Sequence, residues 1–424
     1  MLYKNILKAL LVGMGISTSQ DYPNFEIIHN QNPYQKPIIL HTMSDQNRYM
    51  AIIDSNLNVQ WHINSGNLGL DFKVNQTYLT YFDRLNKSWI LMNEFMKEID
   101  TMICVNSQSA DYHDFQILNN GNYILQAYDS LFVNMSTIVE GGQPVAWITG
   151  IVVIQEFNSD DELVFEWNAW DNLDISNYTN LNLEADIINW MHVNSIEVDF
   201  DDNLLVSNRR SNEIIKINRT NGNVIWHLGG PLNDFSIIND PKNGFKMQHD
   251  ARRINNGNIT IFDNGVTHSP PISRAIEYEI NEENFTANLV WEYIHPDSIL
   301  GLAMGSVQRL PNGNTLINWG TISNQGALIS EVDSANNLVL EIRYPLFHRA
   351  YKVRKNNWAF EVNLICGDTN LDSRIDIYDL QYIADYIYNV NNIHNIYHLF
   401  RADANKDGQI DILDVEVLIS TILL

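Results

Sequence analysis

Short apolar segments alternate with polar residues from about residue 37 to residue 345, and clusters of Asn, Gly and Asp separate them. Alternation with a period of two is typical of half-buried β-strands, and this region has almost no long stretch with the 3.6-residue period of a helix. The pattern therefore predicts an all-β domain.

Two short units recur within this region. A turn of the form N-G-N or D-D-N, followed by a strand, is found at 119–125, 201–207, 255–261 and 311–317. Each repeat closes on a further apolar strand, at 58–63, 163–169, 223–229, 289–295 and 338–344. Asn and Gly adopt the positive φ angles that tight hairpins need.

In chain order these units predict six blades, near residues 37–63, 78–103, 113–169, 192–228, 249–294 and 304–343. Sheets of four strands repeated around a central channel form a β-propeller. We therefore expect a six-bladed β-propeller over residues 21–360. A β-sandwich with irregular repeats is the alternative.

The pattern changes after residue 360, where DLQYIADYIYNVNN and DVEVLISTILL have helical periodicity and each follows an acidic loop. This predicts a separate small α-helical domain at 363–424. The two loops carry the same spacing of oxygen-bearing residues, 35 residues apart. Calcium takes about six to eight oxygen ligands, and this spacing wraps them around one ion. Two calcium ions are expected, one held by Asp368, Asn370, Asp372, the Arg374 carbonyl, Asp376 and Asp379, the other by Asp403, Asn405, Asp407, the Gln409 carbonyl, Asp411 and Asp414.

The repeats GDTNLDSRIDIYDL and ADANKDGQIDILDV resemble the duplicated loop of a type I dockerin. That resemblance implies a cohesin-type partner, which dockerins contact through residues directly after the ninth loop position. The corresponding residues here are Ile377, Tyr378, Ile412 and Leu413. They are more apolar than the small hydroxyl pairs common in cellulosomal dockerins, so a noncognate partner or an intramolecular role stays open.

Three of the 12 histidines stand at the start of predicted innermost strands: His113, His192 and His249. His113 and His249 each precede the Gly of the following turn by eight residues. Equivalent positions of different blades face the same axial channel. We therefore expect the three imidazoles to converge on one pocket.

An arginine is expected beside these histidines. If the strand 192–199 turns at about 200–202, cross-strand pairing places Arg209, or Arg210 one register away, next to His192. A guanidinium beside imidazoles forms a pocket for an anion. Three histidines and a water molecule also satisfy zinc, although an adjacent fixed cation disfavours a metal ion. Side chains that only hydrogen-bond within the channel wall are a further alternative.

The strings HDFQILNNGNYIL, HVNSIEVDFDDNLLVSNRR, QHDARRINNGNITIFDNG and SRAIEY resemble the bacterial aryl-sulfate sulfotransferases that need no adenylyl-sulfate donor. The likeness covers most of residues 25–355 and is weak in the first two blades. It implies transfer of a sulfuryl group from a phenolic sulfate ester to a phenolic acceptor, by a ping-pong route through a sulfohistidine. It also implies that His249 is the nucleophile and that His113, His192 and Arg209 complete the catalytic set.

Sulfuryl transfer spreads negative charge over the peripheral oxygens, so positioned cations stabilise its transition state without an organic cofactor. Either His113 or His192 could transfer the protons. Two other functions stay open: a noncatalytic propeller that binds a sulfated ligand or protein, and an aryl sulfate hydrolase in which water replaces the acceptor.

The net charge of the chain limits the classes of molecule that it can bind. The chain has 26 Lys and Arg against 51 Asp and Glu, a net charge of −25. Such an acidic surface repels polyanions, which argues against a nucleic-acid partner.

Residues 1–20 resemble a signal peptide, and no later segment has the roughly 20 apolar residues of a membrane span, so we expect a secreted, periplasmic or cell-surface protein. Pairing of Cys104 with Cys366 is left open.

Overall fold

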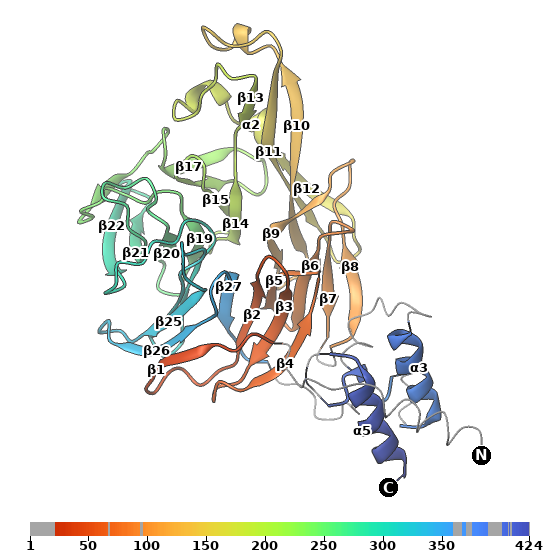
Figure 1. Cartoon of the computed structure of the whole chain (residues 1–424). Coiled ribbons are helices and arrows are strands. Elements are labelled where there is room, and N and C mark those ends of the chain that lie inside the picture. Colours follow the sequence, from red (N-terminus) through yellow and green to blue (C-terminus); the bar gives the residue numbers. More distant parts are fainter. Residues whose placement is uncertain are drawn as a thin grey trace.

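A computed structural model describes residues 22–66, 68–93, 96–358, 367–369, 375–388, 401–405, 407 and 409–423. Six mainly antiparallel sheets stand around a common axis, which confirms the predicted six-bladed propeller (Figure 1). The expected signal peptide lies outside the described residues. In the described part of the chain, no helix has the length and apolar character needed to span a membrane.

The first three blades contain four, four and five strands; four strands of each form an antiparallel meander, and the fifth strand of blade 3 pairs in parallel with the third. Blade 1 consists of β27 (Arg349–Lys355), β2 (Ile38–Met43), β3 (Arg48–Ile53) and β4 (Val59–Asn64). Blade 2 consists of β5 (Leu68–Asn75), β6 (Tyr78–Asp83), β7 (Ser88–Met92) and β8 (Glu98–Met102). Blade 3 consists of β9 (Ala110–Ile117), β10 (Tyr123–Val133), β11 (Ala146–Phe157), β12 (Leu163–Asn168) and β13 (Ile187–Asn189).

Blades 4 to 6 contain the same antiparallel meander of four strands, and blades 5 and 6 each add a fifth strand at the outer edge. Blade 4 consists of β14 (Val193–Val198), β15 (Leu204–Asn208), β16 (Glu213–Ile217) and β17 (Val224–Gly229). Blade 5 consists of β19 (His249–Arg253), β20 (Ile259–Asp263), β21 (Arg274–Asn281), β22 (Thr286–Tyr293) and β18 (Ser236–Ile238). Blade 6 consists of β23 (Ser306–Arg309), β24 (Thr315–Asn318), β25 (Leu328–Val332), β26 (Leu338–Arg343) and β1 (Glu26–Asn30).

The ring is closed at two places by strands from the ends of the propeller. β27 is the innermost strand of blade 1, where it pairs antiparallel with β2. β1 is the outermost strand of blade 6, where it pairs antiparallel with β26. Blades 1 and 6 are thus each built from both ends of the chain, which ties the first blade to the last.

The expected hairpin turns have one common geometry in blades 3 to 6. The amide of the first turn residue donates to the carbonyl four residues later, as in Leu118 to Asn122 (2.8 Å) and Ile254 to Asn258 (2.9 Å). The fourth turn residue has a positive φ, and it is Gly121, Asp202, Gly257 or Gly313. Gly and Asp tolerate this conformation, which explains the recurrence of these residues.

One blade boundary differs from the expectation. Blade 2 was expected to begin near residue 78, but its innermost strand is β5 (Leu68–Asn75). This strand is almost wholly buried, with an irregular register against β6, and so it lacks the clean alternation that marks an exposed strand.

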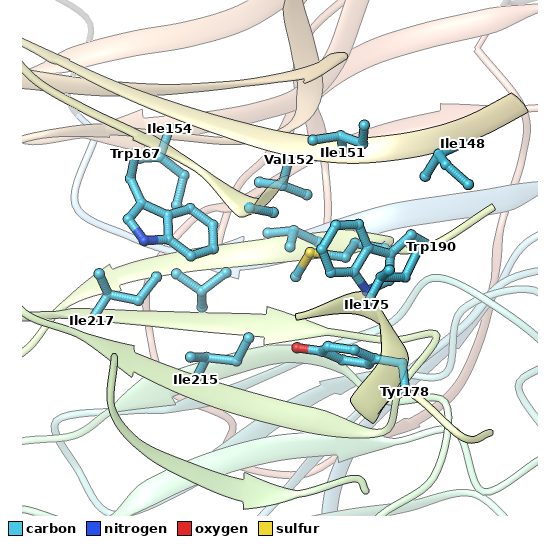
Figure 2. Close-up of a cluster of buried hydrophobic side chains, with 14 of the residues drawn as sticks. Ile148, Ile151, Val152, Ile154, Trp167, Ile175, Tyr178, Trp190, Ile215 and Ile217 are labelled. Carbon is cyan, nitrogen blue, oxygen red and sulfur yellow. The ribbon is translucent and has the colours of Figure 1, made fainter. Parts of the chain in front are cut away.

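Apolar side chains fill the spaces between neighbouring blades. Between blades 3 and 4, Ile154 of β11 and Ile215 of β16 belong to one buried cluster that also contains Trp167 and Trp190 (Figure 2). The Trp167 indole N–H donates to the carbonyl of Gly222 across this space at 3.0 Å. The closing strands therefore stabilise the ring by placing large side chains against the next blade.

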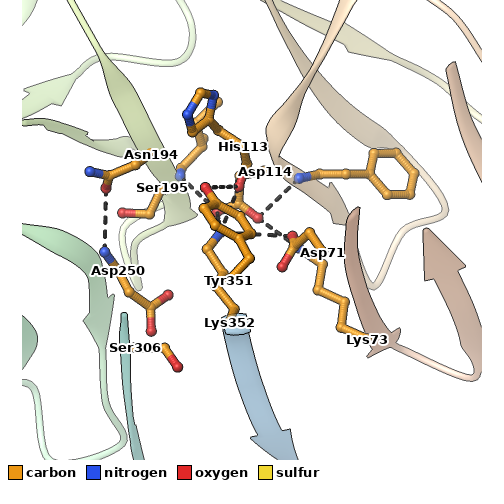
Figure 3. Close-up of polar contacts among 12 residues, drawn as sticks. Asp71, Lys73, His113, Asp114, Asn194, Ser195, Asp250, Ser306, Tyr351 and Lys352 are labelled. Carbon is orange, nitrogen blue, oxygen red and sulfur yellow. Dashed lines mark hydrogen bonds and ion pairs between the residues drawn. The ribbon is translucent and has the colours of Figure 1, made fainter. Parts of the chain in front are cut away.

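The propeller axis is lined by buried ion pairs instead of apolar side chains (Figure 3). Asp114 of β9 accepts hydrogen bonds from Lys73 of β5 at 2.7 Å and from Arg252 of β19 at 2.6 Å. Although burial opposes ionisation, these cations and Lys352 hold the pKa of Asp114 well below its usual range. The complete set, which we call the axial ion network, is Asp71, Lys73, Asp114, Glu197, Asp250, Arg252, Lys352 and Arg354.

This network reaches the innermost strand of every blade. Asp250 accepts hydrogen bonds from Arg354 of β27 at 2.5 Å and from the Val307 amide of β23 at 3.1 Å. Asp114 accepts another from the Ile196 amide of β14 at 3.0 Å. Because these strands belong to different sheets, the network connects them where no backbone ladder does.

Few helices are present in the described residues. The loop after β12 contains the short α2 (Ala169–Asn172), and the 3-10 turns are η1 (Met135–Thr137) and η2 (Ile175–Asn177). The C-terminal region contains α3 (Ile377–Ile387) and α5 (Ile412–Leu423), which agrees with the expected helical domain. Its core is formed by Ile383, Ala402 and Leu418.

We predict that Asp114→Asn lowers the free energy of unfolding by about 3 to 5 kcal/mol, because it leaves buried cations without a counter-charge. The depressed pKa of Asp114 means that its contribution is complete above about pH 4 and is lost as the pH falls below that value. Urea denaturation at neutral pH measures the effect.

The matched control is Asp45→Asn, which breaks an exposed 2.9 Å pair with Arg349. Its expected cost is below about 1 kcal/mol. Equal costs for the two variants would contradict a structural role for the axial ion network.

Candidate active site

Three histidines lie together at one end of the propeller axis. His113 belongs to β9, His249 is the first residue of β19, and His192 directly precedes β14. The ring centroids of His113 and His192 are 4.6 Å apart, and those of His192 and His249 are 6.3 Å apart. The three imidazoles thus form one cluster from three neighbouring blades, on the face where the inner strands begin.

The histidines do not all occupy the same position in their blades. His113 and His249 stand eight residues before the positive-φ residue of the turn, whereas His192 stands ten residues before Asp202. The position equivalent to His113 in blade 4 is Asn194, whose amide donates to the Gln248 carbonyl at 2.7 Å. His192 therefore lies nearer the open end of the channel, and it is less buried than the other two histidines.

Arg209 lies beside His192, as the cross-strand register requires. Val193 pairs with Asn208, and the Arg209 amide donates to the His192 carbonyl at 2.9 Å. The neighbouring Arg210 has an exposed side chain, whereas Arg209 is half-buried. The cation next to the histidines is therefore Arg209.

The Arg209 guanidinium has unused hydrogen-bonding capacity. One terminal nitrogen donates to the Leu302 carbonyl at 3.1 Å, and its buried Nε–H has no partner. No carboxylate forms an ion pair with it among the described residues, in contrast to Arg252 and Arg274. A partly buried guanidinium without a counter-charge is suited to bind an anion.

The tautomer of His249 follows from its contacts with Asn264. The Asn264 side-chain amide donates to the carbonyls of Gly301 (2.8 Å) and Met304 (3.0 Å), so its oxygen must face the histidine. That oxygen lies 2.6 Å from His249 Nδ1, which therefore carries the proton. The lone pair is left on Nε2, where it accepts a 3.2 Å hydrogen bond from the Met304 amide.

His113 is paired with a carboxylate that lies two residues before it. Nδ1 of His113 contacts Asp111, whose carboxyl group also accepts hydrogen bonds from the His113 amide (3.0 Å) and Gln126 (2.9 Å). Burial opposes ionisation of Asp111, but His113 and these hydrogen bonds lower its pKa below the usual value. This arrangement directs the Nδ1 proton to Asp111 and leaves Nε2 to exchange protons.

The other two histidines are kept neutral. Burial, together with the charges of His113 and Arg209, lowers the pKa of His192 to about 3. Burial also lowers the pKa of His249 well below its ordinary value, and Arg209 adds to this effect although the Asn264 hydrogen bond opposes it. The cluster therefore combines two neutral imidazoles, one carboxylate-paired imidazole and one guanidinium.

Sequence analysis did not identify Asp111, Asn264 or the loop 301–304. Asp111 could have been found, because residues two apart share one face of a strand. Asn264 follows β20, whose Phe262 pairs with His249, so only the exact hairpin register places it beside Nδ1. No sequence pattern indicates that the carbonyls of Gly301 and Met304 hold the Asn264 side chain.

The arrangement does not favour zinc. His249 uses both ring nitrogens in hydrogen bonds, and His113 uses Nδ1. Within the part of the chain that the structure describes, no group of three or more His, Cys, Asp or Glu is arranged to hold a metal ion. The alternative of a His₃ zinc site thus has no geometric support.

The C-terminal loops are described only in part. Asn370, Asp372 and Arg374 of the first loop lie outside the described residues. In the second loop, burial raises the pKa of Asp414 to about 7, and the carboxylates of Asp403 and Asp407 add to the increase. Such crowding of carboxylates fits a divalent cation that would neutralise them.

The helix starts beside these loops are alike. Asp379 accepts a hydrogen bond from the Asp376 amide at 2.8 Å, and Asp414 accepts one from the Asp411 amide at 2.9 Å. Ile377 and Tyr378 are exposed at the start of α3, whereas Ile412 and Leu413 at the start of α5 are half-buried.

Cys104 is buried in the propeller, which raises its thiol pKa to about 12, and Cys366 lies outside the described residues.

The fold is a six-bladed propeller with three histidines and an arginine clustered at one end of its axis. Residues 90–345 match the family described as arylsulfotransferase (ASST). This range is more than half of the chain, which therefore belongs to the arylsulfotransferase family. Residues 366–423 match the dockerin type I domain.

Curated relatives match over a short range. Arylsulfate sulfotransferase AssT of Escherichia coli O6:H1 (strain CFT073) is 30% identical over 137 residues, which are 25% of this chain and 23% of that protein. The protein of the same name from Lelliottia amnigena is 29% identical over an equal range. Each match therefore spans less than a quarter of the relative's length.

A solved structure of a protein of unknown function from Bacteroides caccae has a TM-score of 0.46 at 12% identity. The likeness covers 75% of this chain and 98% of that protein. It carries no argument about function.

We predict that Arg209→Gln raises the pKa of His192, because it removes a nearby positive charge while the burial remains. The pKa of His249 should rise for the same reason. Titration of the imidazole C–H resonances by NMR measures both shifts. The control Arg210→Gln should give a smaller shift, and a larger one would contradict the placement of Arg209 as the nearest cation.

Proposed function

We propose that the protein is an aryl-sulfate sulfotransferase that moves a sulfuryl group from a phenolic sulfate ester to a phenolic acceptor. The observation that carries this proposal is the contact of His249 with Asn264, which leaves an unprotonated Nε2 in a pocket that also holds the unpaired Arg209 guanidinium. The nucleophile and the anion site are thus side by side.

In the first half-reaction, Nε2 of His249 gives up its 3.2 Å hydrogen bond from the Met304 amide, and its lone pair attacks sulfur. The N–S bond forms as the S–O bond to the phenol breaks, and the His249 proton stays on Nδ1, from which it is donated to the Asn264 oxygen. The leaving phenolate takes a proton from Nε2 of His113, whose positive charge Asp111 stabilises before the transfer. The products are a sulfohistidine and a free phenol.

In the second half-reaction, the acceptor phenol takes the place of the first. Nε2 of His113 removes the phenol proton as the new S–O bond forms and the N–S bond breaks. His249 returns to its starting tautomer, since Nδ1 keeps its proton throughout. Neither half-reaction uses an organic cofactor.

Arg209 and His192 hold the sulfuryl oxygens. Charge accumulates on these oxygens in the transition state, and preorganised donors stabilise it. Arg209 supplies a fixed positive charge. His192, with a pKa of about 3, stays neutral and can donate one N–H without competing for the phenol proton. Assigning proton transfer to His113 therefore follows from its carboxylate partner.

Two alternatives use the same pocket. An aryl sulfate hydrolase would resolve the sulfohistidine with water, and a noncatalytic propeller would bind a sulfated ligand without bond cleavage. Release of nitrophenol from p-nitrophenyl sulfate separates the three functions. Release that depends on an added phenol supports the transferase, release that is unaffected by phenol indicates a hydrolase, and no release indicates binding alone.

We predict that His249→Asn lowers turnover at least about 10³-fold and abolishes covalent labelling, because the attacking nitrogen is removed. Intact-protein mass spectrometry after mixing with p-nitrophenyl sulfate, in the absence of acceptor, measures the added sulfuryl group. Labelling of this variant would show that another residue is the nucleophile.

The control is the same substitution at His113. Because nitrophenolate leaves without a proton, His113→Asn should still acquire the label, but it should transfer it slowly to a phenol that needs deprotonation. Circular dichroism of both variants checks that the propeller is folded.

For the C-terminal domain we propose two bound calcium ions and a cohesin-type partner that contacts Ile377, Tyr378, Ile412 and Leu413. The matched dockerin type I domain and the crowded carboxylates of the second loop support this. A dockerin that recruits an enzyme to a partner implies an extracellular or cell-surface location, for which residues 1–20 would serve as the signal peptide.

We predict that EDTA unfolds residues 363–424 and leaves sulfuryl transfer unchanged, because the metal ligands and the transfer pocket share no residue. Limited proteolysis with and without calcium measures the first effect, and nitrophenol release measures the second. Loss of transfer with EDTA would instead indicate that the propeller itself needs a metal ion.

A further inference from the structure

A second hollow lies on the propeller face opposite the histidines. It has a volume of about 590 Å³, and it is lined by residues of blades 2 to 4 at the ends of their inner strands, which include Gln76, Gln116, Asn119, Glu197 and Phe200. These positions follow the inner strands, whereas the histidines stand at the strand starts. We call this site the turn-face hollow.

Phe200 stands out at the rim of this hollow. It occupies the second position of the turn between β14 and β15 and is 67% exposed. The equivalent turn positions in blades 3, 5 and 6 hold Asn119, Asn255 and Pro311, which are residues that favour turns. The turn geometry therefore does not require a phenylalanine, and the exposed ring is available to contact a ligand at the rim of the hollow.

Hydrogen-bonding groups are available next to this ring. The side-chain amide of Gln116 is half-buried and makes no side-chain hydrogen bond within the described part of the chain. Glu197 uses one carboxylate oxygen to accept a 2.9 Å bond from Arg252. Amide and carboxylate groups of this kind pair with hydroxyl groups, which both donate and accept.

The charges of the hollow disfavour an anionic ligand. Glu197, Asp199 and Asp202 line it together with one cation, Arg219. Arg219 is already bound to Glu156, to which its Nε donates at 2.6 Å. An incoming anion would thus find carboxylates and no free cation, which is the reverse of the situation at Arg209.

We propose that the turn-face hollow binds a neutral saccharide, with Phe200 as the platform on which a sugar ring stacks. A pyranose ring presents one face of C–H groups to an aromatic ring and a rim of hydroxyl groups to Gln116 and Glu197. The volume lies in the range of sites for small ligands. This site does not depend on the proposed sulfuryl transfer.

Affinity electrophoresis of the full-length protein tests the proposal. The native gels contain hydroxyethylcellulose, arabinoxylan or galactomannan as neutral probes, and dextran sulfate as an anionic probe. The expected result is retardation by at least one neutral polysaccharide and none by dextran sulfate. No retardation by any neutral probe, or retardation by dextran sulfate alone, would overturn the proposal.

Two variants locate the binding. Phe200→Ala should weaken binding up to about tenfold, which corresponds to about 1.4 kcal/mol and lies at the upper end of the range for a stacked aromatic contact. Phe132→Ala is the matched control. Phe132 of β10 is 71% exposed, like Phe200, but it does not line the turn-face hollow. Both variants should release nitrophenol at the wild-type rate. Unchanged binding by Phe200→Ala, or equal loss in both variants, would refute the assignment to this hollow.

Discussion

The axial ion network is the constraint on which the rest of the propeller depends. Each inner strand belongs to its own sheet, so no backbone ladder crosses the axis. Asp114 and Asp250 bridge these strands instead, because each accepts hydrogen bonds from side chains or amides of at least two other blades. The buried charges are costly to desolvate, and they are stable only while every partner is in place. The position of each inner strand at the axis therefore depends on the positions of the inner strands of other blades.

The same network positions the histidine cluster through a repeated dipeptide. In blades 3 and 5, a histidine is followed directly by an aspartate, and the two pairs are His113 with Asp114 and His249 with Asp250. In each pair the carboxylate enters the network while the imidazole belongs to the pocket. Asp250 adopts a positive φ of 57°, an uncommon conformation that its hydrogen bonds to neighbouring blades hold in place. Lys352 also donates to the His113 carbonyl at 2.6 Å.

Local sequence patterns predicted the parts of this protein that repeat. The recurrent turns gave the six blades, and cross-strand register placed Arg209 beside His192, because both depend on residues near one another in the chain. The partners of the histidines were harder to predict. Asn264 is held by carbonyls of the loop 301–304, and such contacts between consecutive blades have no periodic signal. The axial ion network was not predicted for the same reason, since it joins residues as distant as Asp114 and Arg252.

The network also bears on why the proposed reaction needs a covalent intermediate. Asp114 and Lys352 are buried on the axis next to the histidines, so in the proposed reaction we expect donor and acceptor to reach His249 from the opposite face. In-line displacement requires the attacking and leaving groups to lie on opposite sides of sulfur. A pocket with one entrance cannot place two phenols in that way, whereas His249 can attack from the inner side and later leave from it. Each phenol then occupies the same outer position in turn, and storage of the sulfuryl group on Nε2 is what makes a single entrance sufficient.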